Sequence, residues 1–506
     1  MRIFSSKYIK DLDAATCEAQ GIDSLTLMER AANAVAKEIV SMFLPSRRIV
    51  VIAGPGDNGG DALAVSRILS EQGYANIEVY LFNVTGELSP NCEEQKKRLL
   101  ECNVKFVEIT TSFNPPHLEK NVVVIDGLFG PGLREPLTGG FAMVARLINE
   151  SGAYVVSIDI PSGLAGEWNA EARFRDMIHA NLTLTFQFPK LSFFFGEHAD
   201  ILGETRILDL DLDQKSMKSI PSDWLYVESR TIRPLLRPRA LFSAKRDYGS
   251  VMMFAGSMGM MGAAVLAARS ALKCGAGLVT VHSARIGLSI LQSAVPEAMF
   301  EPDRNDRVIS DMSLHHTHQA VAVGPGMGTN EATINALESM LKTCKSPLVL
   351  DADALNCIAK RPSLLTLLPP CSVITPHIGE FDRLFGEQKS SELRLKKAIE
   401  MAKYYNIVIV LKSHHTMIVR PTGKVYFNST GNPGMATAGA GDVLTGVIAG
   451  FMAQGFQPEH AATIGVYVHG LAGDIATREI GEYGVVASDI ADRLGRAIKD
   501  IIDRSV

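Results

Sequence analysis

The stretch RRIVVIAGPGDNGGDALAVSRIL, residues 47–69, decides the fold of the first half of the chain. It opens with a β-branched apolar run that stops at Gly54, which is typical of a strand buried on both faces of a sheet. A glycine-rich turn follows, and an Ala-rich pattern then predicts a helix over about 61–72. Strand, glycine turn and helix in this order indicate a βαβ unit.

Similar units lie on both sides of this stretch. Helical periodicity predicts helices up to about residue 44 and over about 90–102 and 139–151. Apolar runs predict strands at IEVYLF, NVVVIDG, AYVVSIDI and TLTFQF, residues 77–82, 121–127, 153–160 and 183–188. The alternation predicts an α/β domain, with a mostly parallel sheet and helices on both faces.

A second alternation follows a break in the pattern. Residues 212–239 carry charges and prolines without a clear period, so we place a domain boundary near 215–225. The strands expected after it are GSVMMFAGS, GLVTVHS, AVAVGPG, PLVLDAD, SVITPH and IVIVLKS, residues 249–257, 277–283, 320–326, 347–353, 372–377 and 407–413. An Ala-rich helix over 264–276 is expected to pack closely on a neighbour, and further helices follow residue 442. We therefore expect two α/β domains, over 1–215 and 225–506.

The composition of the chain limits the classes of protein to which it can belong. The chain has 506 residues, too many for one ordinary domain, and its 50 Lys and Arg against 55 Asp and Glu give a net charge of −5. Without a basic run, we expect no nucleic-acid partner. No apolar stretch approaches the ~18 residues of a membrane span, and the charged first residues lack the apolar core of a secretory signal. Seven scattered cysteines without a CxxC pattern fit reduced thiols, so we expect a cytoplasmic protein with no membrane partner.

The turn GPGDNGGD, residues 54–61, is the first candidate site. Its GxGxxG pattern alone fits either a dinucleotide-binding turn or a merely tight turn. A dinucleotide-binding turn is expected to have an acidic residue about 20 positions further on, at the end of the next strand. Glu78 fits this pattern poorly, because it lies within its strand. Asn58 and Asp61 flank two glycines, which permit unusual backbone angles, so side chains and amides could converge on one ligand.

Two further carboxylates, Asp126 and Asp159, end strands in the same half of the chain. Either one alone could instead cap a helix or form a turn. Because the carboxyl ends of parallel strands meet at one edge of a sheet, we expect both to line one pocket with the glycine turn.

The motifs GPGDNGGD, DGLFGPGL, DIPSG and TFQFPK, in this order, resemble the YjeF-type NAD(P)H-hydrate epimerase domain over about residues 5–213. The resemblance implies a Rossmann-like three-layer αβα fold and a potassium ion held by Asn58, Asp126 and Ser162. It implies that the hydrated nicotinamide dinucleotide contacts Asp57, Asn58, Gly59, Gly60, Asp61, Gly130, Pro131, Gly132, Leu133, Arg134, Glu135, Pro136 and Asp159. The family usually has Asn at the position of Asp57, so this chain adds a negative charge beside the ligand.

The motif MATAGAGDVLTG, residues 435–446, is the strongest in the chain. Gly439, Gly441 and their small neighbours leave backbone N–H groups exposed at the start of an apolar helix, which is a ready anion site. Asp442 lies beside these amides, where it could accept a proton from a substrate hydroxyl while the amides neutralise a transferring phosphoryl group. A helix N-cap is the alternative role for Asp442.

This motif resembles the ribokinase-type fold, whose kinases use the aspartate as a base. Together with AGSMGMMGAAVLAARSALKCGAGLVTV, GPGMG, DADAL and TPHIGE, it resembles the ADP/ATP-dependent NAD(P)H-hydrate dehydratases over about 240–500. The resemblance implies that the hydrate contacts Ala263, Gly326, His377 and Asp442. It implies that the adenine nucleotide contacts Lys412, Ser413, His414, His415, Thr416 and Gly441. Glu380 would hold Mg²⁺ through water.

One segment departs from this family. The family commonly reads LKGAxT where this chain reads LKSHHT, residues 411–416. The two histidines add bulk where the nucleotide is expected to pass, so we expect the adenine or ribose contacts and the choice between ADP and ATP to depend on them.

Other polar groups admit a plainer interpretation. His315, His316 and His318 have no cysteine or carboxylate at ligand spacing, which favours a solvated loop over a metal site. Asp351 and Asp353 could be an acid–base pair or the cap of the following helix, and we assign them no catalytic role.

The two resemblances together imply repair of hydrated NADH and NADPH. Hydration puts a hydroxyl on C6 of the ring, beside N1; Asp442 would deprotonate it, the β-phosphoryl of ADP (or the γ-phosphoryl of ATP) would transfer to it, and phosphate would leave. The N-terminal domain would interconvert the R and S hydrates, with Asp159 as the first acid–base candidate and Lys190 as the second. The implied cofactors are K⁺ for the epimerase and Mg²⁺ for the dehydratase, with ADP as co-substrate, in a homo-oligomer of four or more chains.

Two alternatives stay open at this point. The GAGD motif also suits an ATP-dependent vitamin-type kinase. The N-terminal domain could also be a non-catalytic module that binds a dinucleotide or another protein, for which Asp57 is the only hint in the sequence.

Overall fold

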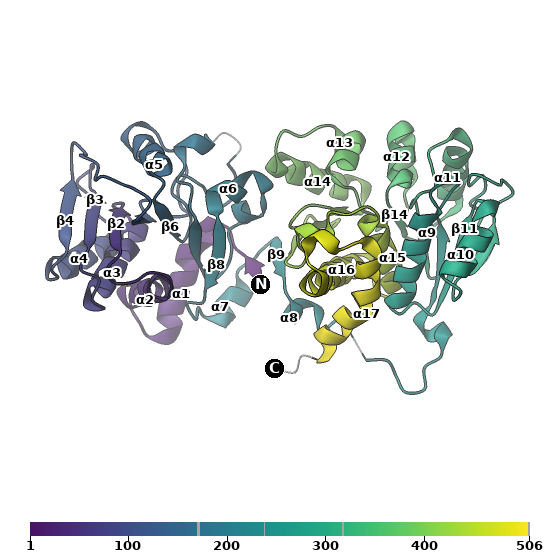
Figure 1. Ribbon diagram of the computed structural model, residues 1–506, viewed down its shortest axis with the longest axis horizontal. Helices are drawn as coiled ribbons and strands as arrows, with labels where there is room; N and C mark the ends of the chain where they lie inside the picture. Colours follow the sequence, from purple (N-terminus) through teal and green to yellow (C-terminus); the bar gives the residue numbers. More distant parts are fainter. Residues whose placement is uncertain (170–172, 237, 316–317, 504–506) are drawn as a thin grey trace. The chain divides into compact units, whose positions relative to one another are not determined.

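The computed structural model (Figure 1) describes residues 1–169, 173–236, 238–315 and 318–503. Backbone contacts divide the chain into two compact units. Arg2–Ser222 with Ser390–Glu392 form the N-terminal unit, and the remaining residues form the C-terminal unit. Within the described ranges, no helix is both long and apolar enough to cross a bilayer.

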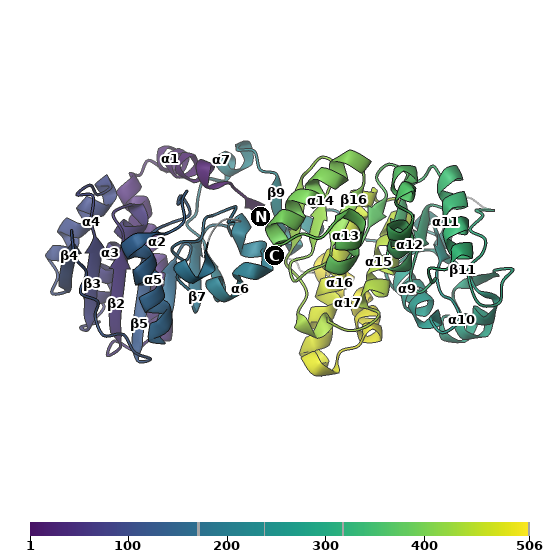
Figure 2. The ribbon, with the colours of Figure 1, turned by 90° about the horizontal axis from the view of Figure 1, so that it is seen from above.

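The N-terminal unit is built on a parallel sheet with the strand order β4-β3-β2-β5-β6-β7-β8. Figure 2 shows β4, β3, β2 and β5 side by side. The strand bounds are β2 Arg48–Ala53, β3 Ile77–Phe82, β4 Lys105–Ile109, β5 Val122–Gly127, β6 Tyr154–Ile158, β7 Leu182–Phe186 and β8 Glu204–Leu208, after a short β1 at Arg2–Ile3. From β2 the chain adds strands first on one side and then, from β5, on the other, so the topological switch point lies between β2 and β5.

Helices cover both faces of this sheet. In β2, Ile49 and Val51 pack into the apolar cluster under α2, α3 and α4, whereas Val50 and Ile52 pack into the cluster under α5. The helix bounds are α1 Ile9–Gln20, α2 Ser24–Met42, α3 Asp57–Glu71, α4 Pro90–Leu100, α5 Gly139–Ser151, α6 Ala199–Leu202 and α7 Gln214–Ser219. The strand is buried on both faces, which explains its unbroken apolar run and confirms the predicted three-layer fold.

The C-terminal unit contains a larger sheet with the order β9-β18-β17-β16-β15-β14-β13-β10-β11-β12. Its pairs are parallel except for β17, which is antiparallel to both neighbours. The strand bounds are β9 Trp224–Val227, β10 Ser250–Phe254, β11 Leu278–Ser283, β12 Met299–Pro302, β13 Ala320–Val323, β14 Leu348–Leu350, β15 Val373–Ile374, β16 Val408–Leu411, β17 Met417–Val419 and β18 Val425–Asn428. The order reverses between β10 and β13, which places a second switch point there.

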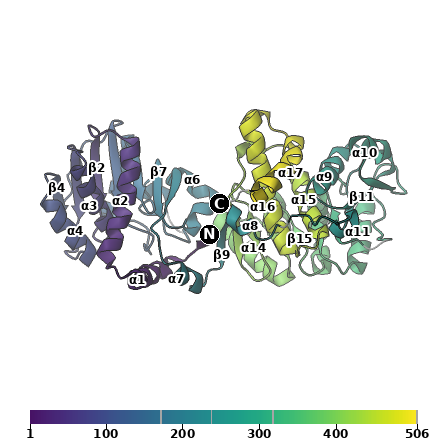
Figure 3. The same cartoon turned by 90° about the horizontal axis from the view of Figure 1, so that it is seen from below.

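Helices also cover both faces of the C-terminal sheet, as predicted for an α/β domain. Figure 3 shows α9, α15, α16 and α17 grouped together, and Figure 2 shows α11 and α14 on the side of the sheet away from α16 and α17. The helix bounds are α8 Ser229–Ile232, α9 Met261–Lys273, α10 Leu288–Ala294, α11 Glu331–Thr343, α12 Asp353–Lys360, α13 Ile378–Phe385, α14 Ser391–Tyr405, α15 Ala440–Ala453, α16 Pro458–Ile480 and α17 Ala487–Asp503.

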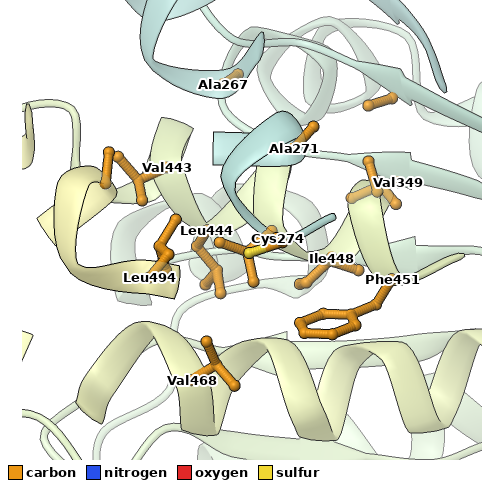
Figure 4. Close-up of a cluster of buried hydrophobic side chains, with 14 of the residues drawn as sticks. Ala267, Ala271, Cys274, Val349, Val443, Leu444, Ile448, Phe451, Val468 and Leu494 are labelled. Carbon is orange, nitrogen blue, oxygen red and sulfur yellow. The ribbon is translucent and has the colours of Figure 1, made fainter. Parts of the chain in front are cut away.

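The Ala-rich helix packs on a neighbour as closely as its composition predicts. Ala267 and Ala271 of α9 face the apolar side of α15, where Leu444 and Ile448 lie (Figure 4). A Cβ on Gly446 would lie 2.0 Å from the carbonyl oxygen of Ala267. Small residues on both helices therefore allow a backbone-to-backbone approach that fixes the start of α15.

Several boundaries differ from the sequence prediction. The first helical stretch is two helices, α1 and α2, because Gly21 ends α1 with a left-handed φ of 65° and Asp23 caps α2. The helix α3 begins at Asp57 rather than near 61, and α9 spans 261–273 rather than 264–276. The short strands β4, β8 and β17 were not predicted, because β4 and β8 are edge strands without a long apolar run and β17, although paired on both sides, has only three residues.

Two candidate active sites

A cavity of about 760 Å³ opens at the switch point of the N-terminal unit. Its walls come from α1, α2, the start of α3, the loop after β5 and the segments that follow β6 and β7. The predicted contact residues that line it are Asp57, Asn58, Asp61, Gly130, Pro131, Gly132, Leu133, Arg134 and Asp159. Gly59 and Gly60 are instead buried inside α3, and neither Glu135 nor Pro136 lines the described cavity.

Gly54, Gly59 and Gly60 of GPGDNGGD serve close packing, and the two glycines between Asn58 and Asp61 do not adopt the unusual backbone angles that glycine permits. Gly59 and Gly60 are helical. A Cβ on Gly54 would lie 1.8 Å from the carbonyl oxygen of Leu128, and one on Gly59 would lie 1.8 Å from that of Gly54. Because no side chain intervenes, α3 begins directly against the ends of β2 and β5, and its N-terminus opens into the cavity.

Asp159 forms a buried ion pair with Lys190 at one wall of this cavity. It follows β6 with a left-handed φ of 63°, an uncommon conformation for a residue with a side chain. Its Oδ1 atom accepts hydrogen bonds from Lys190 Nζ, from Thr185 Oγ1 at 3.1 Å and from the Phe186 N–H at 3.0 Å. Asp159 and Lys190 are 6% and 3% exposed, so the pair is stable only because each charge is hydrogen-bonded. No bond to Oδ2 is found among the described residues, which leaves this atom available to a reactant.

Asp126 is hydrogen-bonded to Ser162, and Asn58 lies against Gly130 of the loop after β5. Both oxygens of the fully buried Asp126 carboxylate are hydrogen-bonded: Oδ1 to Ser162 Oγ at 2.6 Å and the Leu128 N–H, and Oδ2 to Ser157 Oγ at 2.7 Å and the Ser162 N–H. Burial raises the pKa of Asp126, against the effect of these donors. A Cβ on Gly130 would lie 3.7 Å from Asn58 Oδ1, and Asn58 Nδ2 is buried with no hydrogen bond in the described structure.

Two more acidic side chains, Asp57 and Asp61, line the cavity. Asp57 Oδ1 accepts a hydrogen bond from Ser89 Oγ at 2.7 Å. Burial, followed by the charges of Asp159 and Asp57, raises the pKa of Asp61 well above its ordinary value. Glu78 takes no part, because it pairs on the sheet with Arg48 and Lys105, and this explains why the dinucleotide fingerprint is incomplete.

Adjacent strand ends carry a charged network in the C-terminal unit. Lys412, after β16, lies 2.9 Å from Oδ1 of Asp351, after β14, and 3.8 Å from Oε2 of Glu380, which belongs to α13 after β15. Asp351 Oδ2 accepts a hydrogen bond from Thr445 Oγ1 of α15 at 2.7 Å. Asp351 and Lys412 therefore join the strand edge to the helix that carries Asp442.

Asp442 lies in the first turn of α15 without an ion pair or hydrogen bond in the described structure. Gly439 precedes the helix with a left-handed φ of 89°. A Cβ on Gly441 would lie 3.3 Å from Lys412 Nζ and 3.5 Å from Asp351 Oδ2, so a side chain there would crowd these two charged groups. Burial, together with the nearby charge of Asp351, raises the pKa of Asp442 to about 7, while Lys412 opposes this effect. A carboxylate with such a pKa is suited to accept a proton near neutral pH.

The residues predicted to contact the hydrate in this unit lie on different elements. Gly326 follows β13 at the switch point, and a Cβ there would lie 2.9 Å from that of Ala263 at the start of α9. His377 is exposed and caps α13: its Nδ1 accepts the Gly379 N–H at 3.0 Å, and its own N–H donates to Glu380 at 2.8 Å. An isolated bridge joins His377 to Lys412.

The LKSHHT segment is the turn between the antiparallel strands β16 and β17. His414 is exposed, whereas His415 is half-buried, with Nδ1 3.1 Å from the carbonyl oxygen of Asn428 and its ring edge against Tyr226. Burial lowers the pKa of His415 to about 4. The two rings lie edge-to-face, with centroids 4.5 Å apart.

The described histidines of the segment 315–318 do not form a metal-binding cluster. His315 lies 4.0 Å from Glu301, His318 lies 3.3 Å from Ser250 Oγ, and His316 falls outside the described residues. Across the part of the chain that the structure describes, no group of three or more His, Cys, Asp or Glu residues could hold a metal ion.

Sequence reasoning missed two acidic residues that the structure brings to these sites. Asp351 was given no role, yet it holds Lys412; its position at a strand end was the available signal. Asp353, by contrast, starts α12 and accepts the Gly328 N–H at 2.9 Å. Asp13 of α1 lines the N-terminal cavity, and only its helical spacing to Ile9 and Cys17 could have indicated this.

Comparisons with known proteins find a matching family for each half of the chain. A family model described as NAD(P)H-hydrate dehydratase matches residues 251–496, and one described as the YjeF-related protein N-terminus matches 24–192. The bifunctional NAD(P)H-hydrate repair enzyme Nnr of Thermofilum pendens is 34% identical over 99% of this chain and 96% of its own. The same enzyme from Moorella thermoacetica is 34% identical over 99% of this chain and 97% of its own. An ADP/ATP-dependent NAD(P)H-hydrate dehydratase from Bacillus subtilis, co-crystallised with ATP/Mg²⁺, is 32% identical, with a TM-score of 0.49 over 55% of this chain and 98% of that one.

Proposed function

Because this chain belongs to the family of bifunctional NAD(P)H-hydrate repair enzymes, we propose that each unit performs one of the two reactions at the site described above. The chain interconverts the R and S hydrates of NADH and NADPH and dehydrates the hydrate back to the intact dinucleotide, with use of a nucleotide. The observation that supports the placement of dehydration most strongly is Asp442, ionisable near pH 7 at an open helix N-terminus.

Dehydration begins at the hydroxyl on C6 of the hydrated ring. Asp442 takes the hydroxyl proton as the oxygen bonds to the β-phosphorus of ADP, and the bond from that phosphorus to the AMP oxygen breaks. The amides at the start of α15 and the Lys412 ammonium stabilise the charge on the transferring group. The N1 lone pair then expels phosphate from C6, and loss of the C5 proton restores the ring. The products are NAD(P)H, AMP and phosphate; with ATP, the γ-phosphoryl group transfers and ADP is released.

The residues at this site fit a magnesium ion held through water. Glu380 and Asp351 bring two carboxylates against one ammonium, so the site lacks positive charge until a cation accompanies the phosphates. Mg²⁺ usually keeps several waters and binds through one or two carboxylates plus phosphate, so a preformed cluster of ligands is not required. When bound, it would neutralise charge on the transferring group.

The test of this assignment is Asp442→Asn in the full-length chain. We expect dehydration of the S hydrate to fall by about 10²–10⁴-fold, because the base is lost, while epimerisation stays unchanged. Asp353→Asn is the matched control, since it alters a nearby carboxylate of α12 and should keep turnover. Full dehydratase turnover by Asp442→Asn would refute the role of this residue.

Epimerisation must replace the C6 hydroxyl on one face of the ring by one on the other. Loss of the hydroxyl as water gives an iminium between C6 and N1, and water then adds to the opposite face. Asp159 can give and take the proton through Oδ2, while Lys190 holds Oδ1 and keeps the carboxylate in place.

We also propose that a potassium ion binds beside α3 through Asn58, Asp126 and Ser162. The donor set, with the Asn58 amide oxygen, the Asp126 carboxylate and the Ser162 hydroxyl, is all oxygen, which suits a hard cation. Because both Asp126 oxygens are already hydrogen-bonded, binding requires a serine hydroxyl to turn its proton away. When bound, the ion would offset the negative charge of the cavity.

Exchange of K⁺ for a bulky organic cation should slow epimerisation and leave dehydration unchanged. If epimerisation by the wild type and by Asp126→Ala proved equal and indifferent to the cation, the ion would have no place at this site. A homo-oligomer stays a prediction, which light scattering on the purified chain would test.

A further inference from the structure

The cavity of the N-terminal unit contains a carboxyl group on a wall separate from Asp159. Asp13 lies on α1, and the residues of that helix that line the cavity, Ile9, Lys10, Asp13, Ala14 and Cys17, recur with helical spacing. One face of α1 therefore forms this wall. Asp13 is half-buried, and its carboxyl group makes no hydrogen bond or ion pair with any described residue, unlike the Asp159 Oδ1 atom.

The surroundings of Asp13 favour exchange of a proton. Burial raises its pKa to about 6, the Asp159 charge adds to this effect, Lys190 opposes it and Asp57 adds slightly. Lys190 is bonded to Asp159 and so only partly offsets the negative charge. The pKa of Asp61 is also raised well above its ordinary value, first by burial and then by the charges of Asp159 and Asp57.

The reaction needs acid–base chemistry on both faces of the ring. On one face a proton must reach the departing hydroxyl, and on the other a proton must leave the incoming water. Asp159 is fixed by three hydrogen bonds on Oδ1 and cannot follow the reacting atom from one face to the other. A second group on another wall removes this difficulty.

We propose that Asp13 is the second catalytic acid–base residue of epimerisation, serving the ring face turned toward α1 while Asp159 serves the other face. One carboxylic acid donates its proton as the C6–O bond breaks, water departs, and the N1 lone pair forms the C6=N1 bond. The other carboxylate takes a proton from a new water as its oxygen bonds C6, and the electron pair returns to N1. The two carboxyl groups thereby exchange protonation states, and the reverse reaction restores them. This inference rests on the proposed assignment of epimerisation to the N-terminal unit.

The experiment measures R-to-S interconversion of NADH hydrate by the full-length chain without added nucleotide, with dehydration of the S hydrate as the check of folding. We expect Asp13→Asn to slow interconversion by about 10²-fold or more and to leave dehydration unchanged. Asp11→Asn, an exposed position on the same helix, is the control and should behave as wild type. Formate added to Asp13→Ala should restore part of the rate, because it supplies a small carboxylate to the vacated place.

The possible results distinguish a failure of the proposed role of Asp13 from a failure of the proposed function of the N-terminal unit. Interconversion by Asp13→Asn within about threefold of wild type would overturn the inference, and so would a slow variant that neither formate nor Asp13→Glu restores, which would indicate a structural role. If Asp159→Asn is inactive while Asp13→Asn is active, the site assignment survives and the role of Asp13 does not. If the wild-type chain does not interconvert the hydrates at all, the proposed function itself fails.

Discussion

At the scale of single residues, burial and partners give each site the charge that its chemistry needs. Asp159 is held by the ammonium of Lys190, whereas Asp442 is left without a bonded cation, because Lys412 is bonded to Asp351 instead. Burial, and after it the negative charge of Asp351, then raises the pKa of Asp442. We therefore propose that the same residue type serves as a carboxylate held in place in one unit and as a base with a pKa near 7 in the other.

This difference predicts the pH dependence of dehydration. Asp442 accepts a proton only when ionised, and its pKa is raised to about 7, so turnover should rise with pH through about 7 and then level off. The measurement is the turnover number for the S hydrate at saturating ADP across this range. Asp353→Asn removes a like charge and should move the inflection to lower pH; a flat profile around pH 7 would contradict the role of Asp442 as base.

At the scale of elements, the sequence predicts the strands that are buried on both faces and the helices between them. The run RRIVVIA and the motif GAGD identify their strand and helix because apolar burial and glycine packing are local in sequence. The hairpin strand β17, the early start of α3 at Asp57 and the wall formed by α1 depend on tertiary partners, which one sequence does not contain. The same holds for the bond between Lys412 and Asp351, which joins residues far apart in the chain.

The close contact between α9 and α15 predicts that one added methyl group will destabilise the C-terminal unit. Gly446→Ala would place a Cβ 2.0 Å from the backbone of Ala267, so the helices must move apart, at a cost of about 1–3 kcal/mol. Dehydratase activity should be lost at a lower temperature, and turnover should fall with the shifted start of α15. Gly495→Ala, exposed on α17 with no atom within 4 Å of the new Cβ, is the control and should not destabilise the unit. Equal heat stability of the two variants would contradict the packing argument.

The turn between β16 and β17 predicts different roles for its two histidines. His414 is exposed, and an imidazole can stack on adenine, so His414→Ala should raise the Michaelis constant for ADP more than that for the hydrate. His415 is neutral near pH 7 and packs on Tyr226 and Asn428, so His415→Ala should chiefly loosen the hairpin. Steady-state kinetics with ADP and with ATP, beside the exposed control His117→Ala, measures both effects. Unchanged constants for both nucleotides in the double variant would leave the histidines as surface residues.

At the scale of the whole molecule, two α/β units carry complementary sites on one chain. Each site lies at the carboxyl ends of parallel strands near a switch point, where such sheets bind ligands. A stereospecific dehydratase acting alone would leave one epimer of the hydrate behind. An epimerase on the same chain removes this limit, because it converts the remaining epimer into the one that the dehydratase accepts.

The most direct test follows a mixture of R and S NADH hydrate with the full-length chain, ADP, Mg²⁺ and K⁺. The measurement is the amount of each epimer, of NADH, of AMP and of phosphate over time. We predict that both epimers disappear completely and that NADH, AMP and phosphate form in equal amounts, with no lasting phosphorylated hydrate. One epimer left at the end, or a stable phosphorylated product, would contradict the account.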